Sequence, residues 1–260
     1  MTLAPNSRFS SYIIIEQIGV GATGEVYRCQ DPTHGRDVAL KILFPETGVQ
    51  DDETIAQFRQ EAAIMSSLVH PNIPKFYESG FEKGVHFIVS EFLEGEPLRG
   101  PINSSELIKI AVQVAAGISA MHDEGITHND LKRENLIRTS DGCVKIIDFG
   151  VAERFTTEMA SDTNRMTRWR NQIRGDRNAF GLTLYELATG RVPFEAPEAL
   201  RTLSDLLNND LLPLPPETQV AVQDALKLSA AEVGRHAGLL LTAMSVALSL
   251  AGAPVPDLKV

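Results

Sequence analysis

The chain of 260 residues has little cysteine, with only Cys29 and Cys143. The two stand far apart, form no Cys-x-x-Cys pair, and combine with no histidine at the spacing of a zinc site. This excludes a disulfide-stabilised scaffold and a cysteine-based metal module. We expect two free thiols in a reducing compartment.

Positive charge is also scarce. With 24 basic and 34 acidic residues, the net charge of −10 disfavours a nonspecific electrostatic grip on nucleic acid or on an anionic membrane. Any phosphate must therefore be bound by a few local groups. The first residues show no basic segment followed by an apolar run, so we expect no signal peptide, a cytoplasmic location and no nucleic-acid partner.

Long uncharged runs are rare as well. The exception is residues 237–253, AGLLLTAMSVALSLAGA, which carry Thr242, Ser245 and Ser249. A spanning helix needs roughly 20 predominantly apolar residues, and this run is shorter and has no basic flank on its C-terminal side. We predict a buried C-terminal helix rather than a membrane anchor.

Hydrophobic periodicity predicts the order of the elements. Residues 11–44 alternate short β-branched runs with Gly and Asp-Pro, which is typical of antiparallel strands. A helical period begins at residue 52 and stops before His70-Pro71, and two strand-like runs follow near residues 75 and 86. Beyond Pro101 the pattern is helical, with a capping box at Asn103 and Glu106 and a later helix over 179–188 that ends at Gly190.

The predicted fold class is therefore α+β, with two lobes in a single domain over residues 1–260. A β-rich N-terminal lobe with one helix covers about 1–92, and an α-helical C-terminal lobe covers about 93–260.

A glycine-rich stretch, Gly19-Val20-Gly21-Ala22-Thr23-Gly24-Glu25-Val26, lies between two predicted strands. A dinucleotide-binding fold would place a helix after such glycines, so the context disfavours that interpretation. Glycines at this spacing let a hairpin fold closely over phosphates, although a plain turn has the same composition.

Lys41 ends the otherwise apolar strand segment Val38-Ala39-Leu40-Lys41. A lysine there needs a charged partner, because burying an unpaired charge is costly. The expected partner is Glu61, which falls between Phe58 and Met65 on the inward stripe of the next predicted helix. Considered alone, Glu61 would be a solvated helix carboxylate.

Three further side chains stand close together in THNDLKRENL and IDFG, namely Asp130, Asn135 and Asp148. In order, GxGxxGxV, VALK, a helix Glu, HxDLKxxN and DFG form a set that is specific jointly, although each motif is weak alone. On these residues the chain resembles the Hanks-type protein kinases, most closely their bacterial Ser/Thr branch, over about residues 12–194.

The resemblance implies a role for each site residue. Lys41, held by Glu61, would pair the α- and β-phosphates of ATP, and Asp130 would accept the proton of the attacking hydroxyl. Lys132 would face the transferring phosphate, as in Ser/Thr-type loops. Asn135 and Asp148 would hold Mg²⁺, or Mn²⁺ in its place, through oxygen ligands.

The resemblance also implies an adenine site. Apolar side chains would enclose the base, Ser90 would occupy the gatekeeper position, and the backbone of the connecting segment would contact the base edge; with the three glycines this predicted set is Ile18, Gly19, Gly21, Gly24, Val26, Ala39, Ser90, Glu91, Leu93 and Leu136.

The chain departs from the family pattern at two places. Asn129 replaces the arginine that grips a phosphorylated activation loop in many relatives, and Asn cannot form that charge-assisted pair. We therefore expect activity without loop phosphorylation, despite hydroxyl acceptors at Thr156, Thr157, Ser161, Thr163 and Thr167.

The second departure is the segment before Asp176, the residue that matches the start of the central C-lobe helix. Residues 149–175 form a short segment that contains no Ala-Pro-Glu triplet. Arg235 matches the arginine that pairs with the glutamate of this triplet in the family, so Arg235 would lack that partner. The surface that supports a bound peptide is thus shortened or rebuilt, and a partner protein could complete it.

Three interpretations remain open. The favoured one is a Mg²⁺/ATP-dependent Ser/Thr kinase that acts on a protein, either itself or a dedicated partner. The others are a nucleotide-binding scaffold without phosphotransfer and a small-molecule kinase with the same fold.

Overall fold

The computed structural model describes residues 3–21, 24–44, 52–102, 104–156, 159 and 162–190. The predicted helix over 237–253, Arg235 and the capping residue Asn103 lie outside these ranges. The chain divides into two compact units, residues 1–94 with 149–151 and residues 95–148 with 152–260. None of the described helices is long and apolar enough to cross a membrane.

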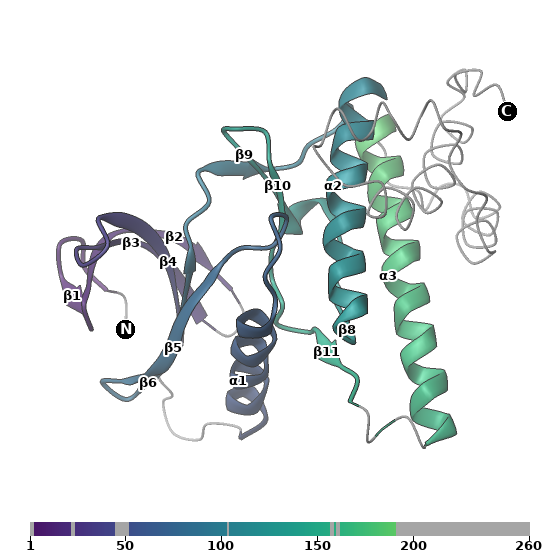
Figure 1. Ribbon diagram of the computed structural model, residues 1–260. Coiled ribbons are helices and arrows are strands. Elements are labelled where there is room, and N and C mark those ends of the chain that lie inside the picture. Colours follow the sequence, from purple (N-terminus) through teal and green to yellow (C-terminus); the bar gives the residue numbers. More distant parts are fainter. Residues whose placement is uncertain are drawn as a thin grey trace, which may run out of the picture. The chain divides into compact units, whose positions relative to one another are not determined.

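The first unit is an antiparallel sheet with one helix (Figure 1). Its strand order is β1-β2-β3-β4-β6-β5. The bounds are β1 Arg8–Phe9, β2 Tyr12–Val20, β3 Gly24–Asp31, β4 Arg36–Leu43, β5 Phe76–Glu82, β6 Val85–Glu91 and α1 Asp52–Ser67. Alternating residues of the central strands, such as Val38 and Leu40, are fully buried in the core of this unit.

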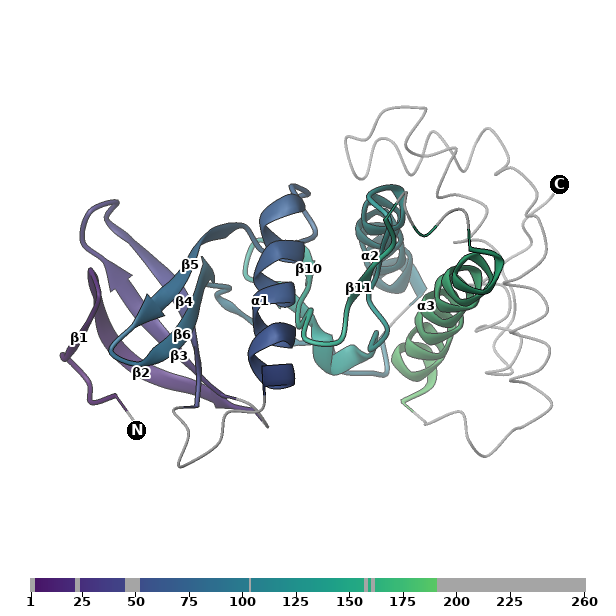
Figure 2. The ribbon, with the colours of Figure 1, turned by 90° about the horizontal axis from the view of Figure 1, so that it is seen from below.

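The second unit is built on two long helices, α2 (Ser104–Asp123) and α3 (Thr163–Thr189), which run side by side (Figures 1 and 2). Short strands complete it: β7 Gly95–Pro97, β9 Leu136–Thr139 and β10 Val144–Ile146 form one sheet, and β8 Ile126–Thr127 pairs with β11 Glu153–Arg154. A single 3₁₀ turn, Arg133–Asn135, precedes β9.

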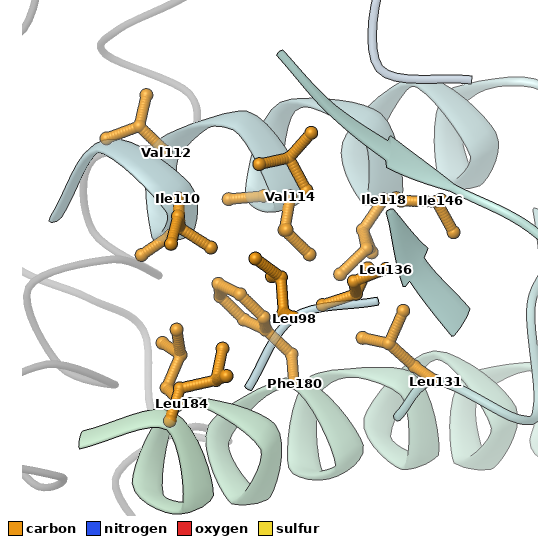
Figure 3. Packing of buried hydrophobic residues seen from close by; sticks show 14 of the residues in the cluster. Leu98, Ile110, Val112, Val114, Ile118, Leu131, Leu136, Ile146, Phe180 and Leu184 are labelled. Atoms are coloured by element: carbon orange, nitrogen blue, oxygen red, sulfur yellow. The ribbon is translucent and has the colours of Figure 1, made fainter. Parts of the chain in front are cut away.

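One apolar cluster joins the two helices to the strands of the second unit. Figure 3 shows Phe180 and Leu184 of α3 directed toward Val114 and Ile118 of α2, with Leu98 among them. All five side chains are at most 4% exposed. Their burial stabilises this unit, since apolar area removed from water contributes about 25 cal/mol per Å².

Helix α3 is longer than predicted, and this corrects the sequence analysis. It begins at Thr163 rather than at residue 179, with the Asp162 side chain accepting hydrogen bonds from Asn164 N at 2.9 Å and Arg165 N at 3.3 Å. The added turns carry no continuous apolar stripe, which is why periodicity missed them. The predicted C-terminal stop is confirmed: Gly190 caps the helix with φ 70°.

Two of the hydroxyl acceptors assigned to a loop therefore lie in a helix. Thr163 and Thr167 occupy the first turns of α3, and Thr167 Oγ1 donates to Thr163 O at 2.9 Å. Thr157 and Ser161 fall outside the described residues. The N-terminal part of α3 thus takes up about half of the expected activation segment, residues 163–175 of 149–175.

Candidate active site

The strand register of the first unit gathers predicted nucleotide residues on one face of the sheet. Val38 and Leu40 enter the core, so Ala39 and Lys41 lie on the opposite face, where both are half-buried. Residues directly opposite each other share a face. The neighbouring pairs are Gly19 with Val26, Val26 with Lys41, and Ala39 with Ser90.

Strand β3, which follows the β2–β3 turn, begins at a position that needs glycine. A Cβ on Gly24 would collide with the carbonyl oxygen of Ile42 on β4, so only glycine lets the start of β3 approach β4 this closely. Gly21 N donates to Gly24 O at 2.8 Å and closes the turn. Ala22 and Thr23, at the tip, lie outside the described residues.

Lys41 forms the predicted pair with Glu61. Lys41 Nζ donates to both carboxylate oxygens at 2.6 Å, and the two side chains are 24% and 6% exposed. Glu61 is directed inward because it shares the buried stripe of α1 with Phe58 and Met65. A charge this deeply buried is stable only with such a partner.

The remaining predicted adenine residues, Ile18, Glu91, Leu93 and Leu136, each lie in a different environment. Ile18 is 46% exposed at an irregularity of β2, where the register with β3 shifts. Glu91 is tied to Lys75 twice, its N–H donating to Lys75 O at 2.8 Å and its Oε2 accepting from Lys75 N at 3.0 Å. Leu93 follows as a half-buried residue, and Leu136 is buried in the core of the second unit.

In the second unit, the Asp176 carboxylate holds the backbone of the loop at residues 128–135, which carries the predicted catalytic residues Asp130 and Lys132 and is called the catalytic loop below. Asp176 is 1% exposed, and its oxygens accept from His128 N at 2.9 Å and from Asn129 N at 2.8 Å. His122 Nε2 of α2 lies 2.8 Å from the same carboxylate. One buried charge on α3 thus ties α2 and the loop together.

Asn129 adopts a left-handed backbone conformation, with φ 64°. Asn tolerates this region better than most residues because its short polar side chain can bond locally. The bend turns the chain between His128 and Asp130, so that His128 is buried while Asp130 is partly exposed.

His128 links this loop to the segment before Asp148. Its Nε2 donates to Ile147 O at 3.0 Å, and its Nδ1 accepts from Asp130 N at 3.3 Å, so the two bonds match the neutral tautomer with its proton on Nε2. Burial lowers the pKa of His128, because the charged form loses its hydration.

The Asp130 carboxylate is held by two neighbours. Lys132 Nζ donates to its Oδ2 at 2.6 Å, and Asn135 Nδ2 donates to the same oxygen at 3.1 Å and to Asp130 O at 2.8 Å. The hydrogen bond to Asp130 raises the pKa of Lys132. The arrangement orients a carboxylate with a fixed ammonium beside it.

Asp148 is placed next to this group through the residue before it. Ile147 N donates to Asn135 O at 2.9 Å, while Ile147 O accepts from His128, so both polar backbone groups of Ile147 are bound to the loop. Asp148 itself has φ 68° and an exposed side chain. The structure therefore brings together Asp130, Lys132, Asn135 and Asp148 within one unit.

The donor set of this unit fits Mg²⁺ rather than a transition metal. The hydrogen bonds of Asn135 Nδ2 leave Oδ1 as its ligand atom, and Asp148 adds a carboxylate, the hard oxygens that Mg²⁺ prefers beside phosphates and water. No cluster of three His, Cys, Asp or Glu side chains able to hold a metal ion occurs among the described residues.

Sequence reasoning missed one participant of the site, His122. It lies on α2, 54 positions before Asp176, and no local motif contains it. The only available signal was its place in the last turn of a predicted helix, where a histidine is common anyway.

Comparison with known proteins agrees with the resemblance to protein kinases. The protein kinase domain matches residues 12–230 of this chain. Serine/threonine-protein kinase PrkC of Bacillus subtilis is 35% identical over 207 residues, which cover 73% of this chain and 32% of that protein.

Two further relatives agree. A probable serine/threonine-protein kinase of Clostridium acetobutylicum is 33% identical over 203 residues, covering 71% of this chain and 31% of the relative. Probable serine/threonine-protein kinase PknB of Lactococcus lactis is 34% identical over 208 residues, covering 73% and 33%. The chain spans about a third of the length of these relatives.

We predict that substitutions of Lys41 and Glu61 have strongly non-additive effects on the free energy of unfolding. Lys41→Met should lower the free energy of unfolding by about 3 kcal/mol, because it leaves the Glu61 carboxylate buried without its cation. Adding Glu61→Gln should recover most of the loss. Urea denaturation of both single variants and the double variant measures the coupling, and strictly additive effects would contradict the buried pair.

We also predict that His128 lowers the stability of the folded protein at acid pH. Its folded-state pKa is lowered, so its contribution to stability is fully present above the unfolded value of about 6.5 and declines as the pH falls below it. Thermal melts between pH 5 and 8 should show this decline. In His128→Gln, which can donate and accept but does not titrate there, the pH dependence should be shallower; an identical profile would exclude His128 as the cause.

Proposed function

We propose, since the chain belongs to the protein kinase domain family, that it transfers the γ-phosphate of ATP to Ser or Thr hydroxyls of a protein. The observation that carries the proposal is the Asp130 carboxylate held by Lys132 and Asn135 at 2.6 and 3.1 Å. The three relatives described above are all named as serine/threonine-protein kinases, two of them as probable ones, which supports the Ser/Thr class.

The proposed mechanism follows from the chemistry of phosphoryl transfer, which needs positioning and neutralisation of charge more than covalent work by the protein. Asp130 accepts the hydrogen bond of the acceptor hydroxyl, orients it and takes its proton as the bond to phosphorus forms. Lys132 balances the Asp130 charge and that of the transferring group. Asn135 keeps the carboxylate in one orientation through two donated hydrogen bonds.

The first unit supplies the nucleotide contacts in this proposal. Lys41, fixed by Glu61, pairs with the phosphates, and the glycine hairpin offers backbone N–H groups to them. The sheet face around Val26, Ala39 and Ser90 contacts the adenine ring. Asn135 Oδ1 and Asp148 would hold Mg²⁺, which would supply positive charge that neutralises the phosphates.

We further propose that activity does not depend on phosphorylation of the segment after Asp148. Asn129 has no positive charge for a phosphate, and its backbone N–H is already bound to Asp176. The loop conformation is held by that buried carboxylate, so no added phosphate is needed to order it.

Direct phosphotransfer is the first test. Intact-mass spectrometry before and after incubation with Mg²⁺ and ATP should show added phosphate on Ser or Thr of the chain or of an added acceptor protein. Asp130→Asn should lose at least about 100-fold in rate while ATP still binds, since general-base and orienting contributions are of that order.

The other two functional interpretations predict different products. ATP binding without any phosphate on protein would favour the nucleotide-binding scaffold. Phosphate on a metabolite alone would favour the small-molecule kinase.

Dependence on loop phosphorylation is tested by phosphatase treatment. A sample stripped of phosphate, with its mass verified, should start phosphorylating an acceptor protein without a lag and at the untreated rate. A lag that shortens as the chain gains phosphate would contradict the role assigned to Asn129.

A further inference from the structure

A groove of about 590 Å³ runs along the N-terminal half of α3 and reaches the catalytic loop, entirely within the second unit. The helix contributes side chains at spacings of three and four residues, which lie on one face. The polar residues that line the groove are Asn129, Asn164, Thr167, Arg168, Asn171 and Gln172.

The lining suits a peptide because it offers both hydrogen-bonding groups and apolar surface. Asn and Gln amides both donate and accept hydrogen bonds, as does each peptide unit of an extended chain. The exposed surface of the lining is mostly apolar, because carbon atoms of these long side chains and of Ala179 face the groove, and this surface can contact the side chains of a bound peptide. The lining acid, Asp176, is already bound to the loop N–H groups.

Gly175 forms part of the floor of this groove and has no packing reason to be glycine. It lies inside a helix, where glycine is less stable than alanine. A Cβ at this position would meet nothing within 4 Å. Glycine here instead allows another backbone to approach the helix closely.

The groove lies beside the reacting group. Asn129 lines it, and Asp130 is the next residue, about 3.8 Å away between Cα atoms. From Asn164 to Ala179 the helix extends about 22 Å. An extended peptide covers that length in about six or seven residues.

We propose that this groove binds the acceptor-carrying segment of the protein substrate in an extended conformation, with an acidic side chain of the substrate on Arg168. The proposal rests on the protein kinase function above. The α3 groove, most of which is formed by residues of the shortened segment 149–175 itself, then serves as the peptide-supporting surface.

Arg168 is suited to exchange partners. Its Nη2 lies 2.7 Å from Glu153 Oε1, and the two side chains are 69% and 40% exposed. An exposed pair of this kind contributes little stability, so a substrate carboxylate can replace Glu153. Arg168 is the only cation among the described residues that line the groove, which limits the acidic preference to one position of the peptide.

The test uses a peptide library with a central Ser or Thr, in which each flanking position is fixed in turn as acidic, basic or neutral. Gly175→Gln, which fills the floor, should raise the KM of the preferred peptide about tenfold and leave kcat within about twofold. Arg168→Gln should abolish the preference for Asp or Glu at one position.

Arg174→Gln is the matched control for charge. Arg174 is exposed on the same helix but does not line the groove, so this variant should keep both the KM and the acidic preference. Melting temperatures check folding: Gly175→Gln should be at least as stable as the native chain, because glutamine is the better helix former.

The outcomes separate the inference from the function on which it rests. Peptides phosphorylated with unchanged KM and preference in Gly175→Gln and Arg168→Gln would overturn the groove assignment alone. A preference for basic flanks would do the same. An unchanged KM with a lowered melting temperature in Gly175→Gln would indicate that another segment of this chain occupies the groove, and would overturn the groove assignment. No phosphate on any peptide or protein, with ATP bound, would remove both proposals.

Discussion

The buried carboxylate of Asp176 is the interaction on which the arrangement of the second unit depends. At 1% exposure it accepts from two consecutive backbone N–H groups of the catalytic loop and lies 2.8 Å from His122. Leaving such donors unsatisfied in the interior costs about 1–3 kcal/mol each. The loop therefore cannot leave α3 without a large penalty, and the helix that carries the core residue Phe180 also sets the position of Asp130.

The rest of the site follows from that attachment through short hydrogen-bonded steps. His128, fixed by Asp176, binds Ile147 O, and Asn135 O binds Ile147 N. These contacts fix the position of the chain just before Asp148, while the Asn135 amide fixes the orientation of the Asp130 carboxylate. The bonds donated by Lys132 Nζ and Asn135 Nδ2 hold the Asp130 carboxylate and the Asn135 amide in one orientation before any nucleotide binds. Preorganisation of this kind is what phosphoryl transfer requires.

Sequence reasoning succeeded where a residue type was out of place for its element. Lys41 on an apolar strand predicted a charged partner, and the helical spacing of the apolar residues of α1 identified Glu61 as that partner. Sequence reasoning failed for the N-terminal half of α3, because its exposed Arg and Asn residues form no apolar stripe. That half is stabilised instead by the Asp162 cap and by the stacking of Trp169 on Phe155, with 5.4 Å between ring centroids. Sequence reasoning also failed for His122, whose contact with Asp176 exists only in the folded chain. Local rules therefore predict the elements and their motifs, but not contacts that join distant segments.

Native-state amide hydrogen exchange at His128 and Asn129, with Asp176→Asn as the comparison, tests the central role of Asp176 most directly. In the native chain both amides should exchange as slowly as the core of α2. In the isosteric variant, which keeps the shape but loses the charge, both should exchange at least about tenfold faster while α2 stays protected, as expected for one weakened charge-assisted bond. Unchanged protection of these two amides would contradict the account, because the loop would then be held by something other than the carboxylate.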